Sequence, residues 1–388
     1  MAIDRRTRIL IVDDSAVMRS LLRSVVSSDA RLEVAGTAAD GASALSAVAL
    51  QRPDLVLLDV EMPVMDGLVT LRQLRAQGHK MPVIMCSSLT QRGAKVTIEA
   101  LAKGASDYVA KPSGQSGREQ ALQKLAQDLL PKIHALTSAL PGRAQRPATL
   151  PVSTRAPLAP PVAPQANLPA ASVPSVLAIG VSTGGPAALE LLLPALPGNF
   201  PLPILVVQHM PEVFTHLLAE RLNERCNLRV REASEGDVIE TGNIYVARGN
   251  WHMEVLAADR PGARDTIHLN QNPPENHCRP AVDVLFRSVA RIYSSGVLAV
   301  VLTGMGYDGL ASCRIVREQG GIVLAQDQAT STVWGMPGAV AQAGLAHRVL
   351  PLAAMAPEIV RISSRANSGK SAPSSAARPI DSSRRAVS

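Results

Sequence analysis

The sequence has no long apolar run. No stretch of signal-peptide length precedes the first acidic pair, and no later run reaches the length that a membrane-spanning helix needs. We therefore expect a cytoplasmic protein that does not insert into the membrane. Cysteine is scarce as well. The four cysteines are far apart in the sequence, without the paired spacing of a zinc site or the density of a disulfide framework. The sequence thus predicts neither kind of site at Cys86, Cys226, Cys278 and Cys313.

The charge of the chain does not require a basic folded surface. The net charge is +7, and residues 137–176 and 364–388 contribute +3 and +4 of it. The rest of the sequence is neutral on balance, so no folded face needs the cationic excess that binds phosphates. We expect no nucleic-acid partner.

Two segments have a composition that disfavours a packed core. Residues 140–174 are rich in proline and alanine, which predicts a semi-extended linker. The tail after Ile362 is rich in serine, alanine and arginine, which predicts disorder. The remaining length suffices for two ordinary cores. We therefore divide the chain into a first domain (1–125), a helical extension and linker (126–174), a second domain (175–363) and a disordered basic tail (364–388).

Both domains show the pattern of an α/β fold. Short continuous apolar runs alternate with helical patterns, as in sheets of buried parallel strands joined by crossover helices. We expect two doubly wound α/β domains with mainly parallel sheets, joined by the Pro/Ala-rich linker. A helix with a kink at Pro131 is expected over 118–136, and an inserted hairpin over 237–246. The predicted strands are residues 9–12, 55–58, 83–85 and 108–109 in the first domain and 176–179, 204–207 and 297–302 in the second.

Acidic side chains follow the predicted strands of the first domain. Asp13 and Asp14 end one strand, and Asp59 ends another. The ligand crevice of a parallel sheet lies outside the carboxyl ends of its strands, so we expect these carboxylates to converge there. Converging carboxylates need a cation, and a hard ion such as Mg²⁺ suits them. One carboxylate is then free to attack phosphorus, although each aspartate taken alone could instead cap the next helix.

The motifs IVDDS, LLDVEMPVMDG, MCSS and YVAKP resemble, in this order, the receiver domains of bacterial response regulators over residues 8 to about 125. The resemblance implies a histidine kinase as phosphodonor. It also implies a metal and phosphorylation site formed by Asp59 as phosphoacceptor and metal partner, Asp13, Asp14 and the Glu61 carbonyl as further Mg²⁺ partners, Lys111 as phosphate contact, and Ser87 and Tyr108 as switch residues. Ser88 is an alternative to Ser87.

The second domain opens with a strand that runs into the glycine-rich turn GVSTGGP at residues 180–186. Glycines let such a turn form, and the helix that starts near Pro186 favours an oxyanion at its N-terminus. Ser182 therefore has the setting of a nucleophile. A phosphate-cradling loop or a plain strand-to-helix turn would show the same pattern.

Two further strand ends of this domain carry residues that would activate a serine. His209 follows one strand and Asp308 follows another, and a serine needs a histidine to take its proton and an acid to orient that histidine. The chain order serine, histidine, acid differs from that of α/β-hydrolases, which predicts a different fold with a convergent triad. The rival residues that the sequence leaves open are His252, His277, Asp283 and Asp327.

The motifs AIGVSTGGP, VVQHMP, PPENHCRPAVDVLF, VVLTGMGYDG and AQDQATSTVWGMPGAV resemble the C-terminal domain of the chemotaxis receptor methylesterases. The resemblance implies hydrolysis of glutamyl methyl esters on chemoreceptor cytoplasmic domains, without a cofactor for this reaction. Many members of the family also deamidate receptor glutamines. Ser182 is then the nucleophile, His209 the base and Asp308 the orienting acid, and Thr183 and Met305 help to form the oxyanion site.

Two positions depart from the pattern of that family. Tyr307 stands where asparagine is common, and Ala281 stands where serine is common. Neither change removes a triad atom, so both bear on substrate fit. The competing readings are a response regulator with a DNA-binding output and a catalytically inactive scaffold. The charge distribution opposes the first, and the complete triad opposes the second.

Overall fold

The computed structural model describes residues 5–88, 90–112, 117–138, 168, 173–260 and 262–364. Most of the predicted linker, at 139–167 and 169–172, and the predicted tail from residue 365 onward lie outside the described residues. Within the described residues, the helices are all too short or too polar to cross a membrane.

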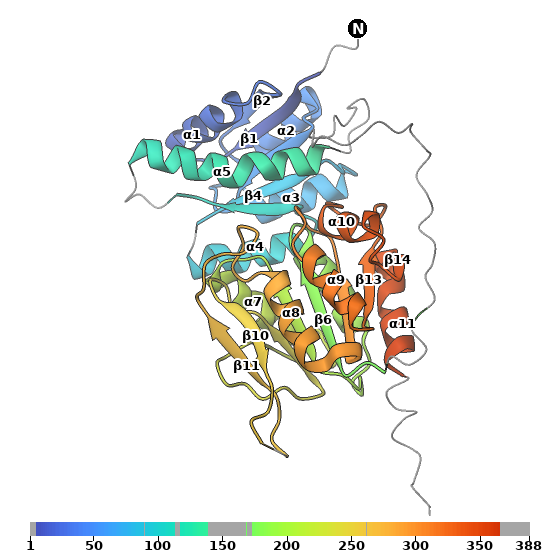
Figure 1. Cartoon of the computed structure of the whole chain (residues 1–388). Coiled ribbons are helices and arrows are strands. Elements are labelled where there is room, and N and C mark those ends of the chain that lie inside the picture. The colour runs from blue at the N-terminus through green and yellow to red at the C-terminus, as the bar shows by residue number, and fades with distance from the viewer. Residues whose placement is uncertain are drawn as a thin grey trace, which may run out of the picture.

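The first domain is a parallel sheet covered by helices on both faces (Figure 1). The strand order is β2-β1-β3-β4-β5, with the single reversal typical of doubly wound folds. The central strands β1 and β3 are buried because their residues are almost all aliphatic. The elements of this domain are β1 (Thr7–Val12), α1 (Ala16–Ser27), β2 (Leu32–Ala38), α2 (Gly41–Gln51), β3 (Leu55–Asp59), α3 (Gly67–Ala76), β4 (Val83–Ser87), α4 (Gln91–Ala102), β5 (Asp107–Ala110) and α5 (Arg118–Thr137).

The second domain is a larger parallel sheet with the strand order β14-β13-β12-β6-β7-β9-β8, and β10 and β11 form a separate antiparallel pair. Its strands are β6 (Val176–Val181), β7 (Ile204–Gln208), β8 (Arg229–Glu232), β9 (Asn243–Val246), β10 (His252–Leu256), β11 (Thr266–Asn270), β12 (Val297–Val301), β13 (Ile322–Gln326) and β14 (Arg348–Leu350). Its helices are α6 (Gly185–Leu192), α7 (Glu212–Asn223), α8 (Val282–Tyr293), α9 (Leu310–Glu318), α10 (Met336–Gln342) and α11 (Leu352–Ser363), with short 3-10 turns at Leu193–Ala195 and Ser294–Gly296. The predicted fold class is confirmed.

One local prediction is wrong. Residues 237–246 do not form a hairpin, because β9 pairs in parallel with β7 and β8. The Gly242 turn that suggested a hairpin instead leads the chain into β9, and the antiparallel pair lies downstream, at β10 and β11. In the first domain, α5 continues through Pro131 and past residue 125, and it packs against α1 and β5.

The two domains are packed against each other. Helix α4 of the first domain contacts α6 and α7 of the second, and Figure 1 shows it at the boundary between them. Buried side chains from both domains join in one apolar cluster. The carboxyl end of β6, where Ser182 follows, therefore lies close to the first domain.

Candidate active site

Ser182 lies on a tight turn between β6 and α6. Its N–H donates to the Thr303 carbonyl at 3.0 Å, and the Gln208 side-chain amide donates to its carbonyl at 3.0 Å. A Cβ at Gly304 would lie 2.9 Å from the Ser182 Cβ, so only glycine lets these two strand ends approach. The turn then enters α6 through Gly184, whose φ of 77° also favours glycine. The serine is thus fixed at the sheet edge and half-buried.

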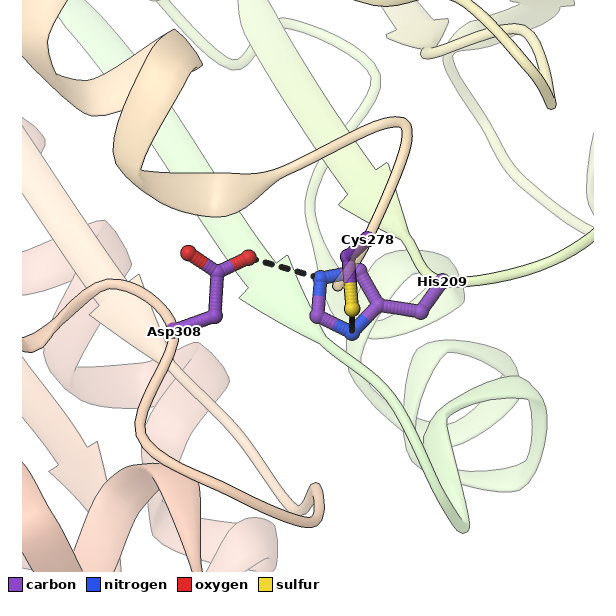
Figure 2. Close-up of side chains that lie close together, drawn as sticks. All are labelled: His209, Cys278 and Asp308. Atoms are coloured by element: carbon purple, nitrogen blue, oxygen red, sulfur yellow. Dashed lines mark hydrogen bonds and ion pairs between the residues drawn. The ribbon is translucent and has the colours of Figure 1, made fainter. Parts of the chain in front are cut away.

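His209 and Asp308 come from the two strands that flank β6. His209 follows β7 and Asp308 lies beyond the end of β12, and both strands are hydrogen-bonded to β6. Their side chains meet, with His209 Nε2 at 2.8 Å from Asp308 Oδ2 (Figure 2). The strand order therefore brings the sequence-predicted serine, histidine and acid to one edge of the sheet.

The Asp308 carboxylate is buried and accepts four hydrogen bonds. Oδ2 accepts from His209 Nε2 and from the Val282 N–H at 2.6 Å, and Oδ1 accepts from the Asp283 N–H at 3.0 Å and Asn276 Nδ2 at 2.8 Å. Burial alone would raise the pKa of Asp308, but His209 and the two N–H groups at the start of α8 outweigh it and keep the pKa below its usual value. Asp308 is therefore a charged acceptor that holds the histidine ring.

Both nitrogens of the His209 ring have neighbours. Nε2 faces Asp308, and Nδ1 lies 3.5 Å from Cys278 Sγ (Figure 2). Burial opposes charging of the ring, but Asp308 and then Cys278 outweigh it and raise the pKa of His209 to about 9. The structure records no hydrogen bond between Ser182 Oγ and His209. Because Nε2 is engaged by the acid, Nδ1 is the nitrogen that remains to accept a proton from the serine.

The rival residues are bonded to other partners or exposed. His252 is held by backbone groups, with Nε2 near the Pro273 carbonyl and Nδ1 near the Ala281 N–H. His277 is exposed. Asp283 accepts from Ser312 and Asn276, and Asp327 accepts from Thr330, so neither carboxylate contacts His209.

The two residues predicted for the oxyanion site lie at the boundary between the domains. Thr183 Oγ1 donates to Asp107 Oδ2 of the first domain at 2.7 Å, and Thr183 is 5% exposed. Met305 packs against a core cluster that includes side chains of the first domain. Among the described residues, the N–H groups of Thr183 and Gly184 have no hydrogen-bond partner, so they remain available as donors.

The acidic residues of the first domain converge as predicted at one sheet edge. Carboxylate oxygens of Asp13, Asp14 and Asp59 lie within 4.8 Å of one another, and Lys111 Nζ lies 2.8 Å from Asp13 and 2.7 Å from Asp59. Asp59 Oδ2 is buried and has no hydrogen-bond partner among the described residues. Burial raises the pKa of Asp59 to about 6, although Lys111 opposes this. One ammonium thus compensates the carboxylates only in part, and a divalent metal ion fits the oxygen ligands that remain.

The predicted switch residues lie on neighbouring strands, Ser87 on β4 and Tyr108 on β5. Ser87 is buried at the end of β4, and its hydroxyl donates to the Ser88 carbonyl at 3.0 Å. The Glu61 N–H lies 3.4 Å from Asp59 Oδ1. The Tyr108 ring stacks on Phe214 of α7, with ring centroids 4.5 Å apart. The predicted switch aromatic is therefore in direct contact with the second domain.

Several residues of the site were not found from the sequence. They are Asn276, Cys278 and Gln208 around the triad and Asp107 and Phe214 at the domain boundary. Asn276 and Cys278 lie inside the motif PPENHCRPAVDVLF, which the sequence alone links to the second domain. The motif therefore indicated that they lie near the site, but it did not indicate their roles. The boundary residues had no such signal, because their contacts depend on how the domains dock.

Comparisons with known proteins match both domains. The family described as CheB methylesterase matches residues 177–359, and the family described as response regulator receiver domain matches residues 9–125. A protein-glutamate methylesterase/protein-glutamine glutaminase of Trichodesmium erythraeum (strain IMS101) is 47% identical over 366 residues, covering 91% of this chain and 98% of that protein. The protein of the same name from Nocardioides sp. (strain ATCC BAA-499 / JS614) is 48% identical over 360 residues, covering 91% and 94%. Among solved structures, the Thermotoga maritima CheB methylesterase catalytic domain has 40% identity, covers 49% of this chain and 98% of that chain, and gives a TM-score of 0.47.

Proposed function

This chain belongs to the protein-glutamate methylesterase/protein-glutamine glutaminase family, and on that premise we propose that it is a phosphorylation-activated serine esterase. Its substrates are glutamyl methyl esters on the cytoplasmic domains of methyl-accepting chemoreceptors, so that it provides adaptation in chemotaxis. The observation that carries the proposal is the His209–Asp308 pair at the sheet edge where Ser182 follows β6. The glutaminase half of the relatives' name supports deamidation of receptor glutamines at the same site.

The catalytic cycle follows from the orientation of the His209 ring. Asp308 holds Nε2–H, and Nδ1 takes the proton as Ser182 Oγ attacks the ester carbonyl. The N–H groups of Thr183 and Gly184, before α6, stabilise the oxyanion. The proton then passes from Nδ1 to the leaving methoxide, and methanol departs from the acyl-enzyme. Water, deprotonated by His209, releases the glutamate carboxylate and restores Ser182. With a glutamine substrate, ammonia leaves instead.

The docked first domain inhibits this cycle. Asp107 accepts a hydrogen bond from the Thr183 hydroxyl beside the nucleophile. Helix α4 packs against α6 and α7, and the Tyr108 ring stacks on Phe214 of α7. Asp59 is the phosphoacceptor. Asp13, Asp14, Asp59 and the Glu61 carbonyl would hold Mg²⁺, which would supply the positive charge that the carboxylates and the incoming phosphoryl oxygens require. Phosphorylation draws Lys111 and Ser87 to the new phosphoryl oxygens, which moves Tyr108 away from Phe214 and favours the open state. A histidine kinase of the chemotaxis system is the phosphodonor.

Methanol release from methylated receptor membranes tests the proposed function. We expect release by the full chain to increase when a small phosphodonor and Mg²⁺ are added. Asp59→Ala should keep its basal rate and lose this response. The function is wrong if the wild-type chain, with the phosphodonor, releases no more methanol than membranes alone.

The raised pKa of His209 predicts an alkaline optimum. His209 accepts a proton only when it is neutral, and its pKa is about 9. The kcat/KM for ester hydrolysis should therefore increase about tenfold per pH unit through neutral pH and level off near pH 9. Initial rates at low ester concentration, measured from about pH 6 to 10, give this profile. A plateau already reached at pH 7 would contradict the raised pKa of His209.

The Asp107–Thr183 hydrogen bond predicts a constitutively faster variant. Removing a buried hydrogen bond to a charged group costs about 1.5–3 kcal/mol, so Asp107→Ala should shift the closed and open populations roughly 10- to 150-fold toward the open form. Basal methanol release without phosphodonor should increase accordingly, and deletion of residues 1–140 should increase it at least as much.

Asp128→Ala is the matched control for that variant. Asp107 and Asp128 both pair with Lys132, at 3.9 and 2.9 Å, but among the described residues Asp128 makes no hydrogen bond to the second domain. Its basal rate should stay close to that of the wild type. If the second domain alone is no faster than the unphosphorylated whole chain, the first domain does not inhibit by covering the site.

A further inference from the structure

Cys278 lies in the proposed catalytic site with no part in the proposed cycle. Its Sγ is 3.5 Å from His209 Nδ1, and both side chains are partly accessible (Figure 2). Because Nε2 donates its hydrogen to Asp308, Nδ1 carries the free lone pair of the neutral ring. A sulfur and an imidazole nitrogen, two ligands that soft and borderline metal ions prefer, therefore face each other.

The position of Cys278 is fixed by its own loop. Glu275 and Cys278 exchange two backbone hydrogen bonds, at 3.1 and 2.9 Å, across a turn whose central residues both have positive φ. Asn276, in that turn, is tied to both Asp283 and Asp308, and Glu275 pairs with Arg287 through both carboxylate oxygens. The thiol is therefore held in place before any ligand arrives.

The separation of the two atoms is that of neighbouring ligands on zinc. Tetrahedral Zn²⁺, with a Zn–N bond of about 2.05 Å and a Zn–S bond of about 2.3 Å, sets nitrogen and sulfur roughly 3.6 Å apart. The atoms here are 3.5 Å apart. Asp308 would stay outside the metal shell, since its oxygens already accept four hydrogen bonds, and would orient the ring through Nε2–H as carboxylates do for zinc-binding histidines.

We propose that Zn²⁺ binds between His209 Nδ1 and Cys278 Sγ, with water at the remaining positions, and inhibits the esterase. Binding forms the Zn–N and Zn–S bonds and releases the thiol proton to solvent, together with the Nδ1 proton where the ring is charged. The bound Zn²⁺ occupies the Nδ1 lone pair that must accept the Ser182 proton. The inhibition therefore rests on the proposed function, whereas the binding of Zn²⁺ does not. Mg²⁺ prefers oxygen ligands and would remain at Asp13, Asp14 and Asp59.

Zinc titration of the full chain tests the inhibition. The assay contains excess Mg²⁺, to occupy the acidic cluster, and a phosphine reductant, to keep the thiols reduced. Each variant is compared with its own metal-free rate. Zn²⁺ should inhibit the wild type, and Cys278→Ser should raise the half-inhibiting concentration by more than about tenfold, since even losing the hydrogen-bond partner of a ligand costs 10- to 100-fold in affinity. Cys226→Ser, which changes a partly buried cysteine on another part of the domain, should leave that concentration unchanged.

Cobalt binding tests the site without any activity. One Co²⁺ per chain, in excess Mg²⁺, should give the intense near-ultraviolet absorption of a cobalt–thiolate bond, and Zn²⁺ should displace it. The band should persist in Cys226→Ser and be missing in Cys278→Ser and Cys278→Ala. The proposal is overturned if wild-type chain shows no thiolate band, or if the band survives in folded Cys278 variants. A thiolate band from a chain whose metal-free form releases no methanol would refute the proposed function and leave the zinc site standing.

Discussion

Replacing Ser182 with alanine should reduce methanol release by about 10⁴-fold or more, because loss of a triad nucleophile has effects of that size in other serine hydrolases. The loss should appear in kcat, since the substitution removes only the attacking hydroxyl. Ser182 sits on the β6–α6 turn, with the N–H groups of Thr183 and Gly184 beside it as donors to an oxyanion. The hydroxyl has no hydrogen bond to His209 in the closed form, so its removal should cost little stability.

Cys278 makes this experiment decisive, because a thiol beside His209 is a second candidate nucleophile. Its N–H bonds back to Glu275 within a closed turn, and that turn offers no helix N-terminus for an oxyanion, which favours Ser182. Ser288→Ala, which removes a buried hydroxyl of the same domain away from the triad, should keep near-normal turnover. A folded Ser182→Ala chain with near-normal turnover, together with an inactive Cys278→Ala chain, would transfer the nucleophile to Cys278.

The arrangement of the triad could be predicted from the sequence because the carboxyl ends of parallel strands meet at one edge of the sheet. Continuous apolar runs identified β6, β7 and β12, and the residues after them had to meet at that edge. The residue pattern alone left Asp283 open beside Asp308, and the family resemblance favoured Asp308. Both are buried beside the start of α8, and only the hydrogen bonds show which one reaches His209.

Contacts that depend on how the two domains dock could not be predicted from the sequence. Asp107 precedes the predicted switch residue Tyr108, yet nothing in its neighbourhood indicates a bond to Thr183, 76 positions later. Such a contact depends on the surfaces of two folded domains rather than on local pattern. The predicted hairpin at 237–246 failed for a related reason, since the Gly242 turn is compatible with either pairing and the parallel partner β7 lies far upstream.

Replacing Asp308 with asparagine should reduce turnover by about 10⁴-fold, the size of effect seen when a triad acid becomes an amide. Each carboxylate oxygen accepts two hydrogen bonds, so the new NH₂ group must face donors in either orientation. If the NH₂ group points at His209, it donates to Nε2, and the ring proton must then lie on Nδ1. Nδ1 can no longer accept the proton of Ser182. Pointed away, it opposes Asn276 and the Asp283 N–H, and the ring still loses the charge that stabilises its cation.

The same loss of charge should lower the pKa of His209. Any residual activity of Asp308→Asn should therefore reach its plateau at a lower pH than wild type, which is a readout that simple destabilisation would not produce. Buried donors left without an acceptor should also reduce the free energy of unfolding by about 1–3 kcal/mol, so stability is measured alongside activity.

Asp283→Asn is the matched control. Asp283 and Asp308 are each 2% exposed and both accept from Asn276, but Asp283 bonds to Ser312 instead of His209. The control variant should lose comparable stability, keep turnover within about tenfold of wild type, and retain the wild-type pH profile. If Asp283→Asn, or Asp327→Asn, shows the large loss and the shifted profile while Asp308→Asn does not, Asp308 is not the residue that orients the base.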